Sequence, residues 1–174
     1  MKDRYRFKKN TNEPHFITIV VKNKVPVFTN NLMMNIIIEN FRFYQKKGLK
    51  IYFYVIMDNH LHMIAAHDND LSQIISNFKS YSAGQLIETV KKDKREWVKT
   101  LFKNEDRDAK YNYNFWEAGS HPKIINGWDM LEQKALYIHN NPVKRGLVEK
   151  PEDWIYSSAR EFYQGDGVFR IDRF

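Results

Sequence analysis

Residues 49–67, LKIYFYVIMDNHLHMIAAH, contain two apolar runs that meet at Asp58 and Asn59. Both runs are rich in β-branched and aromatic residues, which favour extended strands. An Asp-Asn pair suits a tight turn between antiparallel strands, because both side chains bond nearby backbone groups. We therefore predict a β-hairpin with its two arms in 49–58 and 60–67.

The segments on either side of the hairpin show strand and helix patterns. HFITIVVK (15–22) has the composition of a strand. Apolar residues recur at helical spacing in 32–48, which ends at Gly48, and in 71–91, which Asp70 is placed to cap. These patterns predict one strand and one helix before the hairpin and a second helix after it.

The last third of the chain adds a third helical pattern in 128–140. We expect this helix to end near Asn141, because Pro142 disfavours helical backbone in the preceding residue. Residues 114–126 read as a strand or extended loop, and 151–165 as a short capped element. This order predicts an α+β fold that consists of an antiparallel sheet covered by helices.

Composition narrows the class of protein. The 174 residues suit one domain, and 43% hydrophobic with 15% aromatic residues allow a packed core. A net charge of +7 favours polyanionic partners, with nucleic acid first among them. The chain has no cysteine, a polar and basic start, and no apolar run near the roughly 20 residues that span a bilayer. We expect a soluble, cytoplasmic, nucleoid-associated protein with no membrane partner.

The histidine pair His60 and His62 lies in the second arm of the hairpin. Alternate strand residues share a face, so both imidazoles point the same way with Cα atoms roughly 6.5–7 Å apart. An arbitrary His-x-His is more often a pair of partly exposed strand histidines. Here the strand is otherwise core-like, where unbound ring nitrogens are costly, and a shared metal is one way to bind them. Without cysteine, an open site for Mg²⁺ or Mn²⁺ is favoured over a closed zinc site.

The third helix supplies Tyr137 and Asn141 at i and i+4, hence on one helix face. A phenol is a weak nucleophile at neutral pH unless a cation or base assists it, so a metal-bound phosphate nearby would favour its attack. Any one of 10 tyrosines is more often a core-rim residue, and Tyr81 is an alternative nucleophile. His139 would face away from Tyr137, which predicts a structural or DNA-facing role.

Four stretches together resemble the REP-associated tyrosine transposases, which belong to the His-hydrophobic-His (HUH) single-tyrosine transposases with an IS200-like domain. They are MDNHLHMI (57–64), FKSYSAGQLI (78–87), FWEAGSHPKII (115–125) and KALYIHNNPVKRGLVEKPEDWIYSSAREF (134–162). The resemblance covers roughly residues 14 to 163, and the spaced combination is specific although His-x-His alone is not. It implies one domain over 1–174, with a basic lead (1–14) and a short C-terminal extension (151–174).

The resemblance implies a fold, a reaction and the residues that carry it. The fold is ferredoxin-like, with helices packed on one face of the antiparallel sheet. His60, His62 and Asn141 would hold a divalent metal, and Tyr137 would attack single-stranded DNA to give a 5′-phosphotyrosine and a free 3′-OH. The enzyme would nick and rejoin hairpin or repetitive palindromic DNA, as a monomer or as a homodimer.

Basic residues near aromatic ones are candidates for contacts with DNA phosphates and unpaired bases. They are Arg4, Arg6, Lys8, Lys9, Lys79, Lys92, Arg95, Lys144 and Arg145. A solvated surface is about as common an explanation for such runs, and the last two could instead cap helix carbonyls. Two other functions remain open: a domesticated DNA-binding protein that does not cleave, and a metal-dependent hydrolase of soluble phosphate esters.

Overall fold

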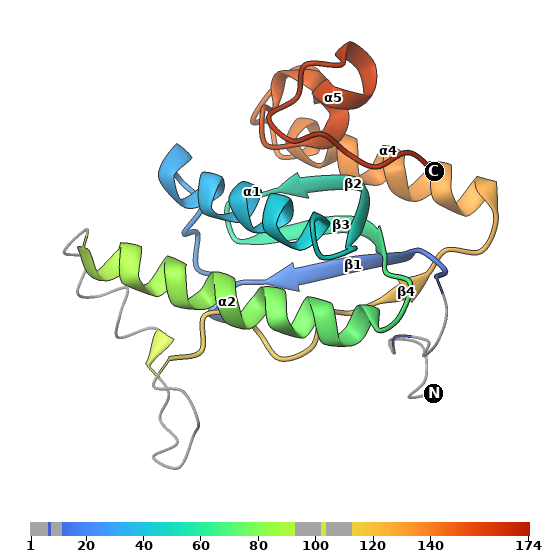
Figure 1. Ribbon diagram of the computed structural model, residues 1–174. Helices are drawn as coiled ribbons and strands as arrows, with labels where there is room; N and C mark the ends of the chain where they lie inside the picture. Colours follow the sequence, from blue (N-terminus) through green and yellow to red (C-terminus); the bar gives the residue numbers. More distant parts are fainter. Residues whose placement is uncertain (1–6, 8–11, 93–101, 104–112) are drawn as a thin grey trace.

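The computed structural model describes residues 7, 12–92, 102–103 and 113–174 (Figure 1). Its centre is a four-stranded sheet in the order β2-β3-β1-β4. The strands are β1 (His15–Val20), β2 (Lys50–Ile56), β3 (His60–Ala66) and β4 (Lys123–Ile124), and each pairing is antiparallel. The predicted hairpin is confirmed as β2 and β3, closed by a hydrogen bond from Met57 N to His60 O of 2.8 Å.

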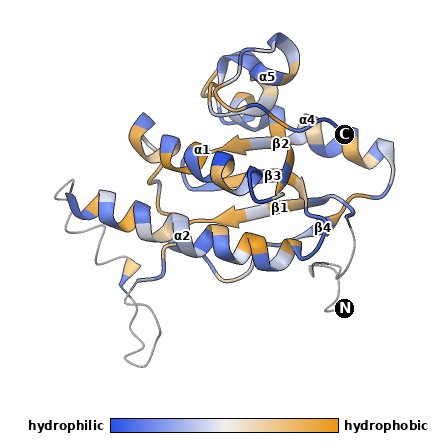
Figure 2. Ribbon diagram, viewed as in Figure 1, coloured by the Kyte–Doolittle hydropathy of each residue, from blue (hydrophilic) through white to orange (hydrophobic). Residues whose placement is uncertain are grey.

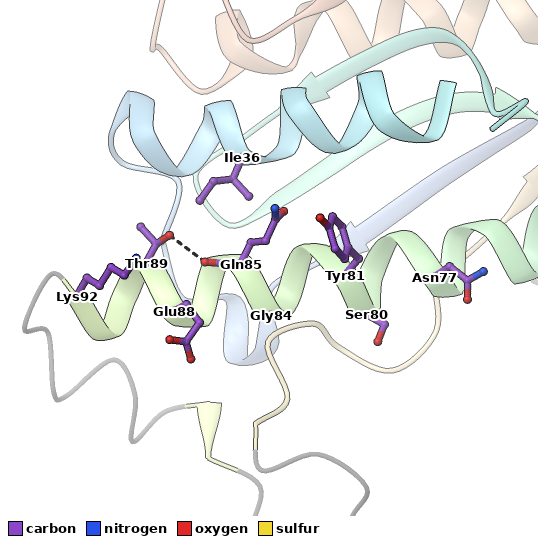
Figure 3. Close-up of a pocket in the computed structure, with 9 residues that line it drawn as sticks. All are labelled: Ile36, Asn77, Ser80, Tyr81, Gly84, Gln85, Glu88, Thr89 and Lys92. Atoms are coloured by element: carbon purple, nitrogen blue, oxygen red, sulfur yellow. Dashed lines mark hydrogen bonds between the residues drawn. The ribbon is translucent and has the colours of Figure 1, made fainter. Parts of the chain in front are cut away.

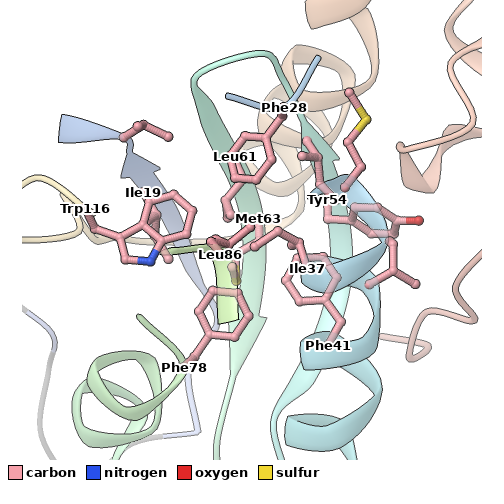
Figure 4. Close-up of a cluster of buried hydrophobic side chains, with 14 of the residues drawn as sticks. Ile19, Phe28, Ile37, Phe41, Tyr54, Leu61, Met63, Phe78, Leu86 and Trp116 are labelled. Carbon is pink, nitrogen blue, oxygen red and sulfur yellow. The ribbon is translucent and has the colours of Figure 1, made fainter. Parts of the chain in front are cut away.

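One face of the sheet carries the main core. Alternate residues of β3, including Leu61 and Met63, point to this face and are fully buried. They pack against α1 (Asn31–Gln45) and α2 (Leu71–Lys92), with Phe41 and Phe78 stacked between these two helices (Figure 4). Hydrophobic and hydrophilic residues alternate around both helices, as expected when one side of a helix is buried (Figure 2).

The opposite face of the sheet is covered by α4 (Trp128–Lys144). Phe53, Val55 and Ile64 point to this face and form a second core with the α4 residues Leu131 and Ile138. The α+β class and the antiparallel sheet are therefore confirmed. The expectation of helices on one face holds for α1 and α2, whereas α4 lies on the other because this face also presents apolar side chains that must be buried.

Side chains cap the starts of α1 and α2, and the cap predicted at Asp70 is confirmed. The Asn30 side chain accepts a hydrogen bond from Met33 N (3.0 Å) at the start of α1. Asp70 does the same for Gln73 N (2.9 Å) at the start of α2. Such caps satisfy backbone N–H groups that have no partner within the first helical turn.

The predicted end of the third helix near Asn141 was wrong, because α4 continues through Pro142 to Lys144. Proline removes one N–H donor, yet the turn stays closed by a hydrogen bond from Arg145 N to Asn141 O of 3.1 Å. Pro142 is also buried, as is Ile138 one turn earlier. Packing of this helix end onto the molecule therefore keeps it helical despite the lost hydrogen bond.

The chain ends against the outer edge of the sheet. A 3₁₀ turn, η3 (Pro151–Asp153), precedes α5 (Ser158–Gln164), which Ser157 caps as the capped-element prediction required. Asp172 then bonds both backbone groups of Ile51 in β2, through its N–H (2.9 Å) and its Oδ2 (2.8 Å). The C-terminal extension thus covers part of an otherwise open strand edge.

Two remaining predictions concern poorly patterned segments. Of the strand or loop predicted in 114–126, only Lys123–Ile124 joins the sheet as β4, and a short 3₁₀ turn, η2 (Lys22–Lys24), follows β1. Most of the basic lead and most of the charged stretch after α2 lie outside the described residues.

None of the helices in the described part has the length and apolar character required to cross a bilayer.

Candidate active site

The histidine pair lies on the α4 face of the sheet, as strand alternation predicts. His60 and His62 occupy the same face of β3 as Ile64, and their ring centroids are 4.7 Å apart. His62 is 6% exposed, and His60, at the start of the strand, is half-buried. The neighbouring β1 residues on this face, Phe16 and Thr18, are only half-buried, so the sheet is left partly open beside the histidines.

His62 is held by its cross-strand partner. Thr18 lies opposite His62 in the β1–β3 register, and its Oγ1 is 2.8 Å from His62 Nδ1. Burial, followed by the charges of His60 and Lys134, lowers the pKa of His62 to about 3. The ring is therefore neutral at pH 7. In the tautomer in which Nδ1 donates to Thr18 Oγ1, the Nε2 atom keeps its lone pair.

His60 is oriented by the residue that precedes it. Asn59 donates from Nδ2 to Lys24 O (3.1 Å), so its Oδ1 faces His60 Nδ1 at 2.6 Å. An amide oxygen only accepts hydrogen bonds, which requires the proton to sit on Nδ1 and the lone pair on Nε2. Burial is the main cause that lowers the pKa of His60, so this ring also favours the neutral form.

Helix α4 brings Tyr137 of the same chain to His62. The two ring centroids are 5.3 Å apart, with the planes at 67°. Phe16 contacts both rings, stacking on His62 (5.3 Å) and meeting Tyr137 edge-on (5.9 Å). Tyr137 remains 38% exposed, so its ring is accessible to solvent while the sheet supports it.

Asn141 lies one turn after Tyr137 on the same helix face, as predicted. Its Nδ2 donates to Tyr137 O (2.7 Å), which orients the amide. Its Oδ1 forms no hydrogen bond with any residue that the structure describes, and is therefore available as an acceptor or ligand. Tyr137 and Asn141 thus project from adjacent turns with the phenol and a free amide oxygen.

Positive charge surrounds the tyrosine. The Nζ atoms of Lys134 and Lys144 each lie 5.6 Å from the centroid of the Tyr137 ring. Arg145 instead donates to Asp58 Oδ2 (2.8 Å), which joins the end of α4 to the β2–β3 turn before His60. The second carboxylate oxygen of Asp58 is buried without a described hydrogen-bond partner.

The other predicted basic residues are spread over the molecule. Lys92 is exposed at the end of α2, whereas Lys79 is half-buried and donates to Glu117 O (2.9 Å) and Gly119 O (2.5 Å). The ammonium group of Lys79 is therefore occupied by contacts within the protein, and its role in DNA binding stays a prediction. The rest of the predicted set lies outside the described residues: Arg4, Arg6, Lys8, Lys9 and Arg95.

The alternative nucleophile Tyr81 and the histidine His139 lie away from the histidine pair. Tyr81 sits on α2, stacked on Phe43 of α1 beside the pocket in Figure 3, hence on the opposite side of the sheet from His62. His139 is buried, and its Nε2 lies 2.9 Å from Ser158 Oγ. Burial lowers the pKa of His139 to about 4, so this histidine is a neutral structural residue.

The donor set fits an open divalent-cation site. His60 presents an Nε2 lone pair, and His62 does so in the tautomer in which its Nδ1 donates to Thr18. Hydrogen bonds at Nδ1 orient both rings, as is usual for metal ligands. The described ranges contain no group of three or more His, Cys, Asp or Glu residues arranged as a metal cluster. A cation held by His60 and His62 would therefore need oxygen ligands such as the Asn141 amide, water or phosphate.

Sequence patterns missed four residues that complete this site. Thr18 and Phe16 enter only through the β1–β3 register, which no local pattern reports. Asn59 was assigned only to the turn, although its position next to His60 was visible. Lys134 lies three residues before Tyr137, so helical spacing could have identified it.

Comparison with known proteins agrees with the fold. A similar solved structure is that of a REP-associated tyrosine transposase bound to a REP hairpin, with a TM-score of 0.64 and 21% sequence identity over 100% of this chain and 95% of that one. Curated protein sequences include no significant match. The family model for IS200-like transposases matches residues 9–140, which include His60, His62 and Tyr137 and stop one position before Asn141. Because this match spans most of the sequence, the chain belongs to the IS200-like transposase family.

Proposed function

We propose that this protein cuts and rejoins single-stranded DNA through a covalent 5′-phosphotyrosine on Tyr137, with a divalent metal held by His60 and His62. The observation that carries the proposal is the approach of Tyr137 to His62 within one chain, with ring centroids 5.3 Å apart. The family match supports a DNA-processing reaction, and the similar solved structure supports hairpin DNA as the substrate.

In the proposed reaction Tyr137 Oη attacks the scissile phosphorus and loses its proton to solvent. The phosphorus–O3′ bond breaks, and the leaving oxygen takes up a proton to become a free 3′-OH. Attack of a 3′-OH on the phosphotyrosine reverses these changes and joins strands. The ester to tyrosine conserves the bond energy, so rejoining requires no nucleotide cofactor.

The residues around Tyr137 have separate tasks in this reaction. His60 and His62 would hold Mg²⁺ or Mn²⁺ through Nε2, with Asn141 Oδ1 as the third protein ligand. When bound, the cation supplies positive charge that polarises the scissile phosphate. His62, with a pKa of about 3, suits ligation rather than proton abstraction. Phe16 and α4 restrict the Tyr137 ring, which favours in-line attack.

The test is covalent capture. The full chain is incubated with Mn²⁺ or Mg²⁺ and a labelled library of single strands, each with a hairpin and unpaired flanks, and denatured products are separated by size. The expected result is a denaturation-resistant protein–DNA adduct that Tyr137→Phe abolishes and Tyr81→Phe retains. An adduct that survives Tyr137→Phe would reassign the nucleophile, whereas hairpin binding with no adduct from the intact chain would indicate a non-cleaving DNA-binding protein.

A further inference from the structure

Lys134 occupies a distinctive position beside the nucleophile. It lies one turn before Tyr137 on the α4 side that faces the sheet, and it is half-buried. Its Nζ is 5.1 Å from the centroid of the Phe16 ring and 5.6 Å from that of Tyr137. The ammonium group is thus placed over two aromatic rings that also contact His62.

The charge of Lys134 has no acidic partner within the described residues. No carboxylate there forms an ion pair with it, whereas Arg145 has Asp58 and Lys79 has two backbone carbonyls. A half-buried cation in this position is stabilised when an anion binds next to it.

The group expected between Tyr137 and the histidine pair is the scissile phosphate. Negative charge on its non-bridging and leaving oxygens is redistributed during attack, and a fixed cation nearby stabilises the transition state. Lysine is suited to this task as a compact point charge on a flexible stem. The aromatic contacts with Phe16 and Tyr137 would keep that stem directed toward the reacting atoms.

We propose that Lys134 is a catalytic residue that binds a non-bridging oxygen of the scissile phosphate through its Nζ. This inference rests on the proposed function and adds a protein cation to the reaction centre, separate from the metal ligands. Lys134 forms no covalent bond in this step, and its ammonium group keeps all its protons. Lys144, which is exposed on the other side of Tyr137, would contact a neighbouring phosphate and contribute to binding.

The first experiment compares rates of adduct formation at saturating hairpin DNA. Lys134→Met keeps the apolar stem and removes the charge, Lys134→Gln is a second neutral variant, and Lys134→Arg restores a cation. Lys46→Met, at the exposed end of α1 near the opposite face of the sheet, is the matched control. Loss of one such electrostatic contact is expected to lower the single-turnover rate by about 10²-fold, with partial recovery in Lys134→Arg. The control should react at the wild-type rate.

A second substrate separates a catalytic role from a structural one. Once the cleaved linkage is mapped with the wild-type protein, the same strand is made with a neutral methylphosphonate at that linkage. If Lys134 acts on the phosphate charge, the deficit of Lys134→Met should shrink to within about 3-fold on this substrate, because the interaction being removed is already absent. A purely structural defect would lower both rates equally.

The outcomes distinguish this inference from the function on which it rests. Absence of an adduct with the wild-type chain would overturn both. A normal wild-type adduct with wild-type rates in both neutral variants would overturn only the role of Lys134. An equal loss on charged and neutral linkages would also reject it and make Lys134 a structural residue. Circular dichroism and thermal unfolding of each variant report whether it is folded.

Discussion

The Tyr137 ring meets the His62 ring edge-on, with centroids 5.3 Å apart and the planes at 67°. The tyrosine comes from α4, and the histidine comes from the central strand of the sheet. Because both belong to one polypeptide, a single subunit assembles the candidate nucleophile and the candidate metal ligands. The contacts that hold α4 on this face of the sheet therefore also hold Tyr137 beside the histidine pair.

Removal of either imidazole should eliminate metal binding while leaving the fold largely intact. His60→Ala and His62→Ala each delete one nitrogen ligand, and a catalytic metal does not have to hold a domain together. Mn²⁺ titration followed by electron paramagnetic resonance should show loss of the bound signal. The control variant His67→Ala changes a half-buried histidine in the loop after β3, away from the pair, and should bind Mn²⁺ as the wild type does. Unfolding of the wild type on chelation would instead indicate a structural metal.

Asn59 should affect metal affinity without being a ligand. Asn59→Ala removes the acceptor that holds the proton on His60 Nδ1, and changes of this kind typically weaken metal affinity about 10–100-fold. Isothermal titration with Mn²⁺ measures the effect directly. Asn69→Ala, at an exposed position after the same hairpin, is the matched control. Unchanged affinity in Asn59→Ala would show that this hydrogen bond does not orient His60.

The second core should contribute substantially to stability because it anchors α4. Ile138 is 0% exposed against the sheet, and Leu136 on the same helix is 46% exposed. Ile138→Ala should lower the free energy of unfolding by about 2–5 kcal/mol, whereas Leu136→Ala should change it by no more than about 0.5 kcal/mol. Urea titrations of both variants make the comparison. Equal effects would mean that α4 is not packed on the sheet in solution.

Acidification should destabilise the metal-free protein between pH 6.5 and about 4. Burial lowers the pKa of His62 to about 3 and of His139 to about 4, so in this interval the unfolded chain binds protons that the native chain excludes. The contribution of these two neutral histidines to the free energy of unfolding is therefore fully present above pH 6.5. It decreases as pH falls, by up to about 1.4 kcal/mol per pH unit for each histidine. Urea unfolding at several pH values gives the slope of the unfolding free energy against pH. In His139→Gln this slope should correspond to one fewer proton taken up on unfolding. An unchanged slope would contradict burial of a neutral His139.

The ion pair between Arg145 and Asp58 should contribute more to activity than to stability. Its side chains are 51% and 30% exposed, and pairs of this kind contribute about 0–1 kcal/mol. Arg145→Gln should therefore unfold at nearly the wild-type urea concentration but form the DNA adduct more slowly, because α4 is less firmly tied to the turn before His60. Asp58→Asn should produce the same defect, and the double variant should be no slower than either single one. Additive rate losses would show that the two residues act separately.

Local patterns in the sequence were sufficient for several elements of the site. Period-two alternation placed His60 and His62 on one strand face, and helical spacing placed Tyr137 and Asn141 on one helix face. The hairpin and the start of α2 at Asp70 followed from turn and cap residues whose effects are local. The end of α4 was mispredicted because packing of Ile138 and Pro142 outweighs the local preference at proline.

The sequence by itself thus determined which side chains share a face within each element, since that depends only on backbone periodicity. Only the tertiary structure decided that α4 covers the face opposite α1 and α2, which brings Tyr137 to His62. It also decided that Thr18 pairs with His62 and that Lys134 lies over Phe16. These contacts depend on strand register and on burial of a second apolar surface, and both arise from long-range packing that no local pattern contains.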